Sequence, residues 1–144
     1  MIVVGVDHSA GAKEALRFAL DEARLRQATL RAVHAIGASH PVLGEELVNP
    51  VAGTRIDELR PAAQAALDAT VDEIASDTGG AQIERRVVDG APASVLIDES
   101  RDAELLVVGS RGLGGFAGLL LGSVSQQCAR HAACPVAVVH KQKQ

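Results

Sequence analysis

The residues with the clearest chemical potential lie in one glycine-rich stretch, and six glycines fall between positions 109 and 122. A glycine backbone can adopt positive φ angles and approach a ligand closely, where a Cβ atom would clash. The apolar run 103–108 before the stretch predicts a buried strand, and Ser123 with Gln126 predicts a helix start with a Ser-x-x-Gln capping box. The free N–H groups and the dipole of such a helix start favour a bound anion. The stretch therefore predicts a phosphate site.

The distribution of charge agrees with this prediction. The chain has a formal net charge of -4, yet no Asp or Glu follows Glu104, so the last forty residues carry +4 and the first 104 carry -8. A positive segment of this size suits a polyphosphate better than nucleic acid, which needs a larger basic patch. The alternative is that the glycines form only a flexible connection and that Ser123 only caps a helix.

Three known phosphate signatures can be compared with the stretch. The P-loop pattern is not met, because the spacing from Gly118 to Ser123 is wrong and no lysine is present. A dinucleotide fingerprint fits residues 112–117 formally, but the acidic residue expected about 20 positions later is missing. The third signature fits fully. The pattern Gly109-x2-Gly112-x9-Gly122-Ser123 resembles the nucleotide-binding motif of the universal stress protein family, in its ATP-binding branch.

The beginning of the chain carries the resemblance further. Residues 1–6 form a β-branched run that ends in Asp7, and an amphipathic helix follows from Ala12. Asp7 thus lies at the carboxyl end of a strand, where open α/β sheets place ligand-binding groups; the alternative is that Asp7 or Ser9 only caps the helix. The segment 5–9 is similar to the one with which the family contacts the nucleoside. His34-Ala35 resembles a family His-Val pair whose second residue lies against adenine through its main chain.

The resemblance implies a binding site for ATP, with or without Mg²⁺, and no catalytic or metal-ligating residue. The nucleoside would meet the first and second strands, ribose and phosphates would meet the glycine loop, and the β and γ phosphates would meet the last helix start. The residues concerned are Gly5, Asp7, Ala35, Val108, Gly109, Ser110, Arg111, Gly112, Leu113, Gly114, Gly115, Gly122, Ser123, Val124 and Ser125. A phosphate contact from Arg111 is left open, because the family varies at this position.

The remaining elements alternate strand and helix. Strands are expected at 29–36, 82–89 and 136–140, a helix from Pro61 to the Gly79-Gly80 stop, a short helix from Pro92, and a long loop over 37–53 that either covers the site or is a disordered insertion. The charges in 82–89 are typical of an edge strand. This succession predicts one doubly wound α/β domain over residues 1–144, with a five-stranded parallel sheet covered by helices on both faces. The resemblance implies the strand order 3-2-1-4-5 and an adenine nucleotide alpha hydrolase-like fold, which places the first and fourth strands together at the switch point.

Composition excludes several classes of function. Aromatic residues make up 1% of the chain, and Trp and Tyr are absent, so base stacking is not available for nucleic acid. No apolar run reaches a membrane span, and residues 1–6 do not resemble a signal peptide, so we expect no membrane partner and a cytoplasmic location. Cys128, His131 and Cys134 lack an evident fourth ligand, and we expect two buried free thiols and no metal.

Three functions remain open. The first is an ATP-binding regulator of stress or energy state. The second is a slow ATPase, which is disfavoured because phosphoryl transfer generally needs metal-binding carboxylates and Asp7 is the only evident carboxylate near the loop. The third is an ATP-independent interaction protein, a branch of the family that lacks the glycine motif. The resemblance also implies a homodimer that pairs through the apolar final strand, Val136 to His140, unless another part of the same chain covers that strand.

Overall fold

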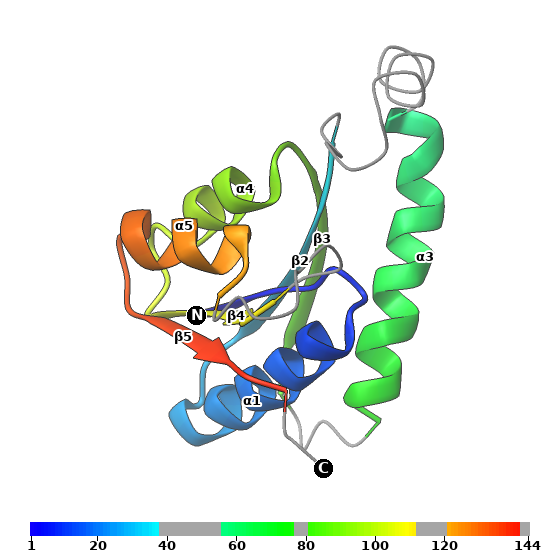
Figure 1. Cartoon of the computed structure of the whole chain (residues 1–144). Helices are drawn as coiled ribbons and strands as arrows, with labels where there is room; N and C mark the ends of the chain where they lie inside the picture. Colours follow the sequence, from blue (N-terminus) through cyan, green and yellow to red (C-terminus); the bar gives the residue numbers. More distant parts are fainter. Residues whose placement is uncertain (38–55, 77–80, 112–120, 142–144) are drawn as a thin grey trace.

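The computed structural model describes residues 1–37, 56–76, 81–111 and 121–141. Strands and helices alternate along the chain, as predicted (Figure 1). In chain order the elements are β1 (Ile2–Gly5), α1 (Ala10–Arg26), β2 (Leu30–Ile36), α3 (Ile56–Ile74), β3 (Ile83–Asp89), α4 (Pro92–Glu99), β4 (Leu105–Gly109), α5 (Ser123–His131) and β5 (Val136–Val139).

The five strands form one parallel sheet in the order β3-β2-β1-β4-β5, which confirms the predicted topology. The central pair is β1 and β4, with Ile2 opposite Leu105 and Val4 opposite Val107. Because the strands are parallel, the chain leaves β1 and β4 at the same edge of the sheet. The segments that follow these two strands therefore start side by side.

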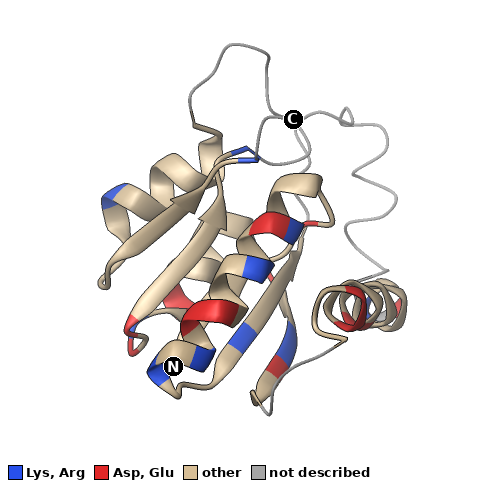
Figure 2. Ribbon diagram, turned by 90° about the horizontal axis from the view of Figure 1, so that it is seen from below, with Lys and Arg blue, Asp and Glu red and all other residues tan. Residues whose placement is uncertain are grey.

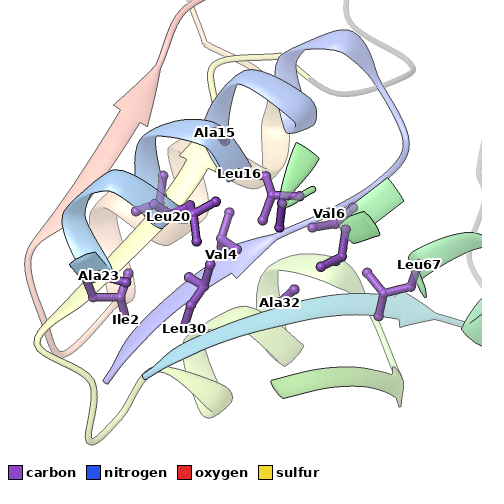
Figure 3. Packing of buried hydrophobic residues seen from close by; sticks show 14 of the residues in the cluster. Ile2, Val4, Val6, Ala15, Leu16, Leu20, Ala23, Leu30, Ala32 and Leu67 are labelled. Atoms are coloured by element: carbon purple, nitrogen blue, oxygen red, sulfur yellow. The ribbon is translucent and has the colours of Figure 1, made fainter. Parts of the chain in front are cut away.

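Helices cover both faces of the sheet (Figure 1). On one face, the apolar side of α1 packs over β1 and β2, and Leu67 of α3 extends this cluster (Figure 3). The six buried residues of α1 recur at helical spacing and are Ala12, Ala15, Leu16, Ala19, Leu20 and Ala23. On the other face, Val95 and Leu96 of α4 and Cys128 of α5 pack against Val3 and the rest of a second cluster.

The charged residues lie mainly outside these clusters. Positively and negatively charged residues alternate along α1 (Figure 2), and Arg26 pairs with Glu22, one turn earlier, at 3.1 Å. Arg85 of β3 pairs with Asp68 and Asp72 of α3 and ties the edge strand to its covering helix. None of the described helices is long and apolar enough to cross a bilayer.

Several boundaries differ from the predictions. The helix expected to begin at Pro61 begins at Ile56, so Pro61 lies inside α3. Proline fits the first turn of a helix best because it has no N–H to donate, but here the helix tolerates one missing hydrogen bond in its second turn. The helix also ends at Ile74, before the Gly79-Gly80 stop at which it was expected to end. Residues 79 and 80, and the part of the predicted loop 37–53 beyond Gly37, lie outside the described residues.

Candidate functional site at the carboxyl ends of β1 and β4

The turn between β1 and α1 is organised by Asp7 and Ser9. The Ser9 backbone N–H and hydroxyl both donate to Asp7 Oδ1, at 3.0 Å and 2.5 Å. The Ser9 hydroxyl oxygen in turn accepts the Ala12 N–H at 3.1 Å and caps α1. Of the two caps that the sequence left open, Ser9 is therefore the one used. Among the described residues none bonds to Asp7 Oδ2, which leaves one carboxylate oxygen for another partner.

Ser9→Ala should lower the free energy of unfolding by about 0.5–2 kcal/mol, because the Ala12 N–H then loses its cap. Urea denaturation followed by circular dichroism measures this change. Ser94→Ala, which changes an exposed serine of α4, serves as the control. Equal stability of both variants and the parent chain would show that the Ser9 cap contributes nothing.

The carbonyl oxygen of Ser110 holds together the two ends of the connection between β4 and α5. This oxygen accepts the Gly122 N–H at 2.6 Å and the Ser125 hydroxyl at 3.0 Å, while the Ser110 N–H donates to Val139 at 2.9 Å. Ser125 is buried, and its hydroxyl also lies 3.0 Å from the Gly122 carbonyl. The ends of the glycine-rich segment are thus held together, and the start of α5 is fixed beside the end of β4.

The predicted capping box is wrong. The N-cap of α5 is Gly122 rather than Ser123, and no side chain caps this helix. Ser123 instead accepts a hydrogen bond from Gln127 at 3.2 Å, and the Gln126 amide donates to the Leu121 carbonyl at 3.2 Å. Because Ser123 is the first helical residue, its side chain is displaced from the N-cap position. The N–H groups of the first turn are therefore not used by a capping side chain, which suits an external acceptor.

The two connections approach each other closely, as the neighbouring positions of β1 and β4 require. A Cβ atom on Gly11 would lie 3.1 Å from the Arg111 carbonyl oxygen, and one on Gly109 would lie 3.0 Å from the carbonyl group of Gly11. The start of α1 thus packs against the backbone that leaves β4. We call this arrangement the strand-end junction, formed by Asp7, Ser9, Gly11, Ser110, Arg111 and Gly122.

The other predicted site residues either pack within the core or lie outside the described residues. Gly5 faces α4, where a Cβ atom would lie 2.7 Å from a methyl group of Leu96, so a larger residue there would have to displace the Leu96 side chain. Ala35 lies in β2 and packs on the same side of the sheet, and Val108 is buried in β4. The predicted residues Gly112, Leu113, Gly114 and Gly115 lie outside the described part of the chain.

Sequence reasoning missed a pair of histidines beside the junction. The ring centroids of His8 and His34 are 4.7 Å apart, and the planes are tilted by 46°. His34 Nδ1 lies 2.7 Å from the Val6 carbonyl oxygen, and His8 Nδ1 lies 3.2 Å from the Thr70 hydroxyl of α3. The signal available in the sequence was that both histidines occur near the carboxyl ends of predicted strands.

The cysteines are free, and only Cys128 is buried. Burial raises the pKa of the Cys128 thiol to about 11, so it is protonated and unreactive at neutral pH. Cys134 is partly exposed, which corrects the prediction of two buried thiols, because this residue follows the end of α5 and packs only at the margin of the second cluster. Within the described segments, no group of three or more potential ligands could hold a metal ion.

The fold and the strand-end junction define a doubly wound α/β domain whose switch point lies between β1 and β4. The profile of the universal stress protein family matches residues 1–140. A universal stress protein of Mycobacterium tuberculosis is 37% identical over 140 residues, which are 96% of this chain and 47% of the relative. The chain belongs to the universal stress protein family. It spans about half the length of the curated relatives that it matches, 47% in this case.

Solved structures show the same likeness. A universal stress protein in complex with cAMP is 31% identical, with a TM-score of 0.68 over 98% of this chain and 96% of the other. A universal stress protein of Archaeoglobus fulgidus in complex with dAMP is 28% identical, with a TM-score of 0.70 over 96% of this chain and 95% of the other. Both neighbours thus carry an adenine nucleotide.

Proposed function

We propose that the chain binds ATP, with or without Mg²⁺, at the strand-end junction and acts as a nucleotide-dependent regulator of stress or energy state. The observation that carries the proposal is the convergence of Asp7 with the start of α5. β1 and β4 are neighbours, and the Gly11 and Arg111 backbones are in close contact. A group that accepts hydrogen bonds from a nucleoside and a helix start that favours phosphate therefore lie at one edge of the sheet.

The donor set of the junction fits a nucleotide. Asp7 Oδ2 can accept a hydrogen bond from a sugar hydroxyl or from an exocyclic amine, since only Oδ1 is used by Ser9. The first-turn N–H groups of Ser123, Val124 and Ser125 are suited to phosphate oxygens, because Gly122 supplies no capping side chain. The cAMP and dAMP complexes of the two solved relatives support adenine as the base.

Equilibrium dialysis with labelled ATP tests the proposal, with AMP and NAD as comparisons. We expect ATP to bind more tightly than AMP, because only ATP has phosphates that reach the start of α5, and more tightly than NAD. A preference for NAD, or no binding by a folded sample, would refute the proposal.

We also propose that β5 pairs with β5 of a second copy in a two-fold symmetric homodimer. All four residues of β5 are partly exposed, and β5 is an edge of the sheet. An apolar edge strand exposes unpaired N–H and C=O groups that favour pairing with another strand.

Val138→Lys should convert this dimer to monomers, because it places a charge in the paired edge. Light scattering measures the change, with Ser94→Lys as a control that adds the same charge on the exposed side of α4. A parent chain with the mass of one 14.9 kDa subunit would refute the dimer. A Val138→Lys protein that stays dimeric would refute β5 as the interface.

A further inference from the structure

His8 adopts a backbone conformation that is uncommon for a residue with a side chain. It directly follows Asp7, and its φ angle is +68°, in the left-handed region that side chains rarely occupy. Ser9, the next residue, returns to an extended conformation and caps α1. Residues in sparsely populated backbone regions persist where surrounding contacts hold them, and they are common at functional sites. The Ser9 hydrogen bonds and the contact of the His8 side chain with Thr70 are therefore among the interactions that hold the turn that presents Asp7.

The hydrogen bonds of the histidine pair fix where its protons lie. The Thr70 hydroxyl donates to the Ala66 carbonyl at 3.0 Å, so it can only accept from His8, and His8 Nδ1 carries the proton of that bond. The Val6 carbonyl only accepts, so His34 Nδ1 is also protonated. Neither Nε2 atom bonds to a described residue. A further proton on the His8 ring must therefore bind at Nε2.

The surroundings of His8 disfavour this further proton. Burial lowers the pKa of His8 most, the neighbouring His34 and then Lys13 lower it further, and only Asp7 acts in the opposite direction. The Lys13 ammonium is itself paired with Glu73 of α3 at 3.1 Å. A charged His8 would be held 4.7 Å from His34, in partly buried surroundings. Movement of the ring into solvent would relieve that cost and would also release the strained backbone.

We propose that His8 is a positioning residue of the nucleotide site, which holds the Asp7 turn in its binding geometry while the ring is neutral and releases it when the ring is protonated. This inference rests on the proposed nucleotide site. Its consequence is that acidification weakens nucleotide binding through the turn, without any contact between His8 and the ligand.

The test compares the parent chain with His8→Gly, because glycine adopts φ of +68° without strain and carries no titrating ring. The affinity for ATP is measured by equilibrium dialysis between about pH 7.5 and pH 5.5, the range in which histidine titrates. The parent should lose at least about threefold more affinity than His8→Gly over this range. Protonation of ATP itself affects both proteins equally and cancels in the ratio. His131→Gln, which removes an exposed histidine at the last position of α5, should follow the parent profile.

Coincident profiles of the parent and His8→Gly would overturn the positioning role. If neither protein binds ATP at any pH, the proposed function fails, and the ligand-free parent decides the role of His8. The nuclear magnetic resonance signal of the Ser9 N–H, which donates to Asp7, should then shift with the same midpoint as the His8 ring. A Ser9 signal that ignores the His8 titration would refute the role.

The stability of the protein should decrease on acidification, in the same direction as its affinity for ATP. Because folding lowers the pKa of His8 below its ordinary value of about 6.5, the neutral ring contributes stability that is complete above that pH. This contribution is lost as the pH falls through the folded-state pKa. The melting temperature of the parent should therefore fall more on acidification than that of His8→Gly.

Discussion

Gly122→Val should lower the affinity for ATP at least tenfold, which corresponds to about 1.4 kcal/mol, while the protein remains folded. Gly122 is the N-cap of α5, and it has an extended backbone with φ of −75° and ψ of 170° that valine can adopt. The cost is therefore expected at the ligand, because a branched side chain would stand where phosphate should meet the backbone. Equilibrium dialysis with labelled ATP measures the loss.

The matched control is Ala91→Val, because Ala91 is also an N-cap with an extended backbone and no capping side chain, at the start of α4. This variant should bind ATP as the parent does. Gly122 is buried, so circular dichroism and the melting temperature must show an intact fold before the affinity is interpreted. Gly122→Ala should cause a smaller loss than Gly122→Val. Unchanged affinity in a folded Gly122→Val protein would remove α5 from the phosphate site.

Gly109→Val is expected to lower the free energy of unfolding by about 1–3 kcal/mol, the usual cost of forcing extra atoms into a packed interior. A Cβ atom on Gly109 would lie 3.0 Å from both carbonyl atoms of Gly11, and this contact is with helix backbone rather than with a side chain that could rotate away. The start of α1 would have to move away from β4. That movement separates Asp7 and Ser9 from Arg111, so affinity for ATP should fall as well.

The sign of the stability change makes this second prediction decisive. In a strand without such a contact, valine is favoured over glycine by up to about 1 kcal/mol, so Gly109→Val would stabilise the protein. Urea denaturation distinguishes the two directions. Gly109→Ala should fall between the parent and Gly109→Val, since it adds only the first of the clashing atoms. A stabilised Gly109→Val protein would contradict the close packing of α1 on β4.

The fold could be predicted because its signals are local and repeated. The apolar positions of α1 recur with helical spacing, and all six are buried. The charges of β3 mark it as an edge, and it is the first strand in the sheet order. The start of α3 was misplaced because a proline is typical of the first helical position. The turn that precedes Pro61 contains Arg60, which donates to the Val87 carbonyl of β3 at 2.7 Å, a contact between distant segments that the local sequence does not reveal.

The candidate site was predictable only in part. The neighbouring positions of Asp7 and of the helix start after residue 122 follow from the strand order, which the family resemblance implied and the structure confirms. The capping box failed because the helix begins at Ser123 itself, so that Gly122 holds the N-cap position and no side chain caps the first turn. The pair His8 and His34 could not be read from spacing, since these residues meet only after β1 and β2 align.

The hydrogen bonds of the Ser110 carbonyl bear on which part of this domain can vary in sequence. This oxygen accepts the Gly122 N–H and the Ser125 hydroxyl, and it thereby holds the two ends of the segment from Ser110 to Gly122 beside the sheet. The entropy of closing a chain segment grows only with the logarithm of its length, so one or two added residues would cost only a few tenths of a kcal/mol. A change in the length or sequence of this segment would therefore leave β4 and the start of α5 in place. Ligand preference could diverge among copies of this domain while the sheet and its helices stay the same.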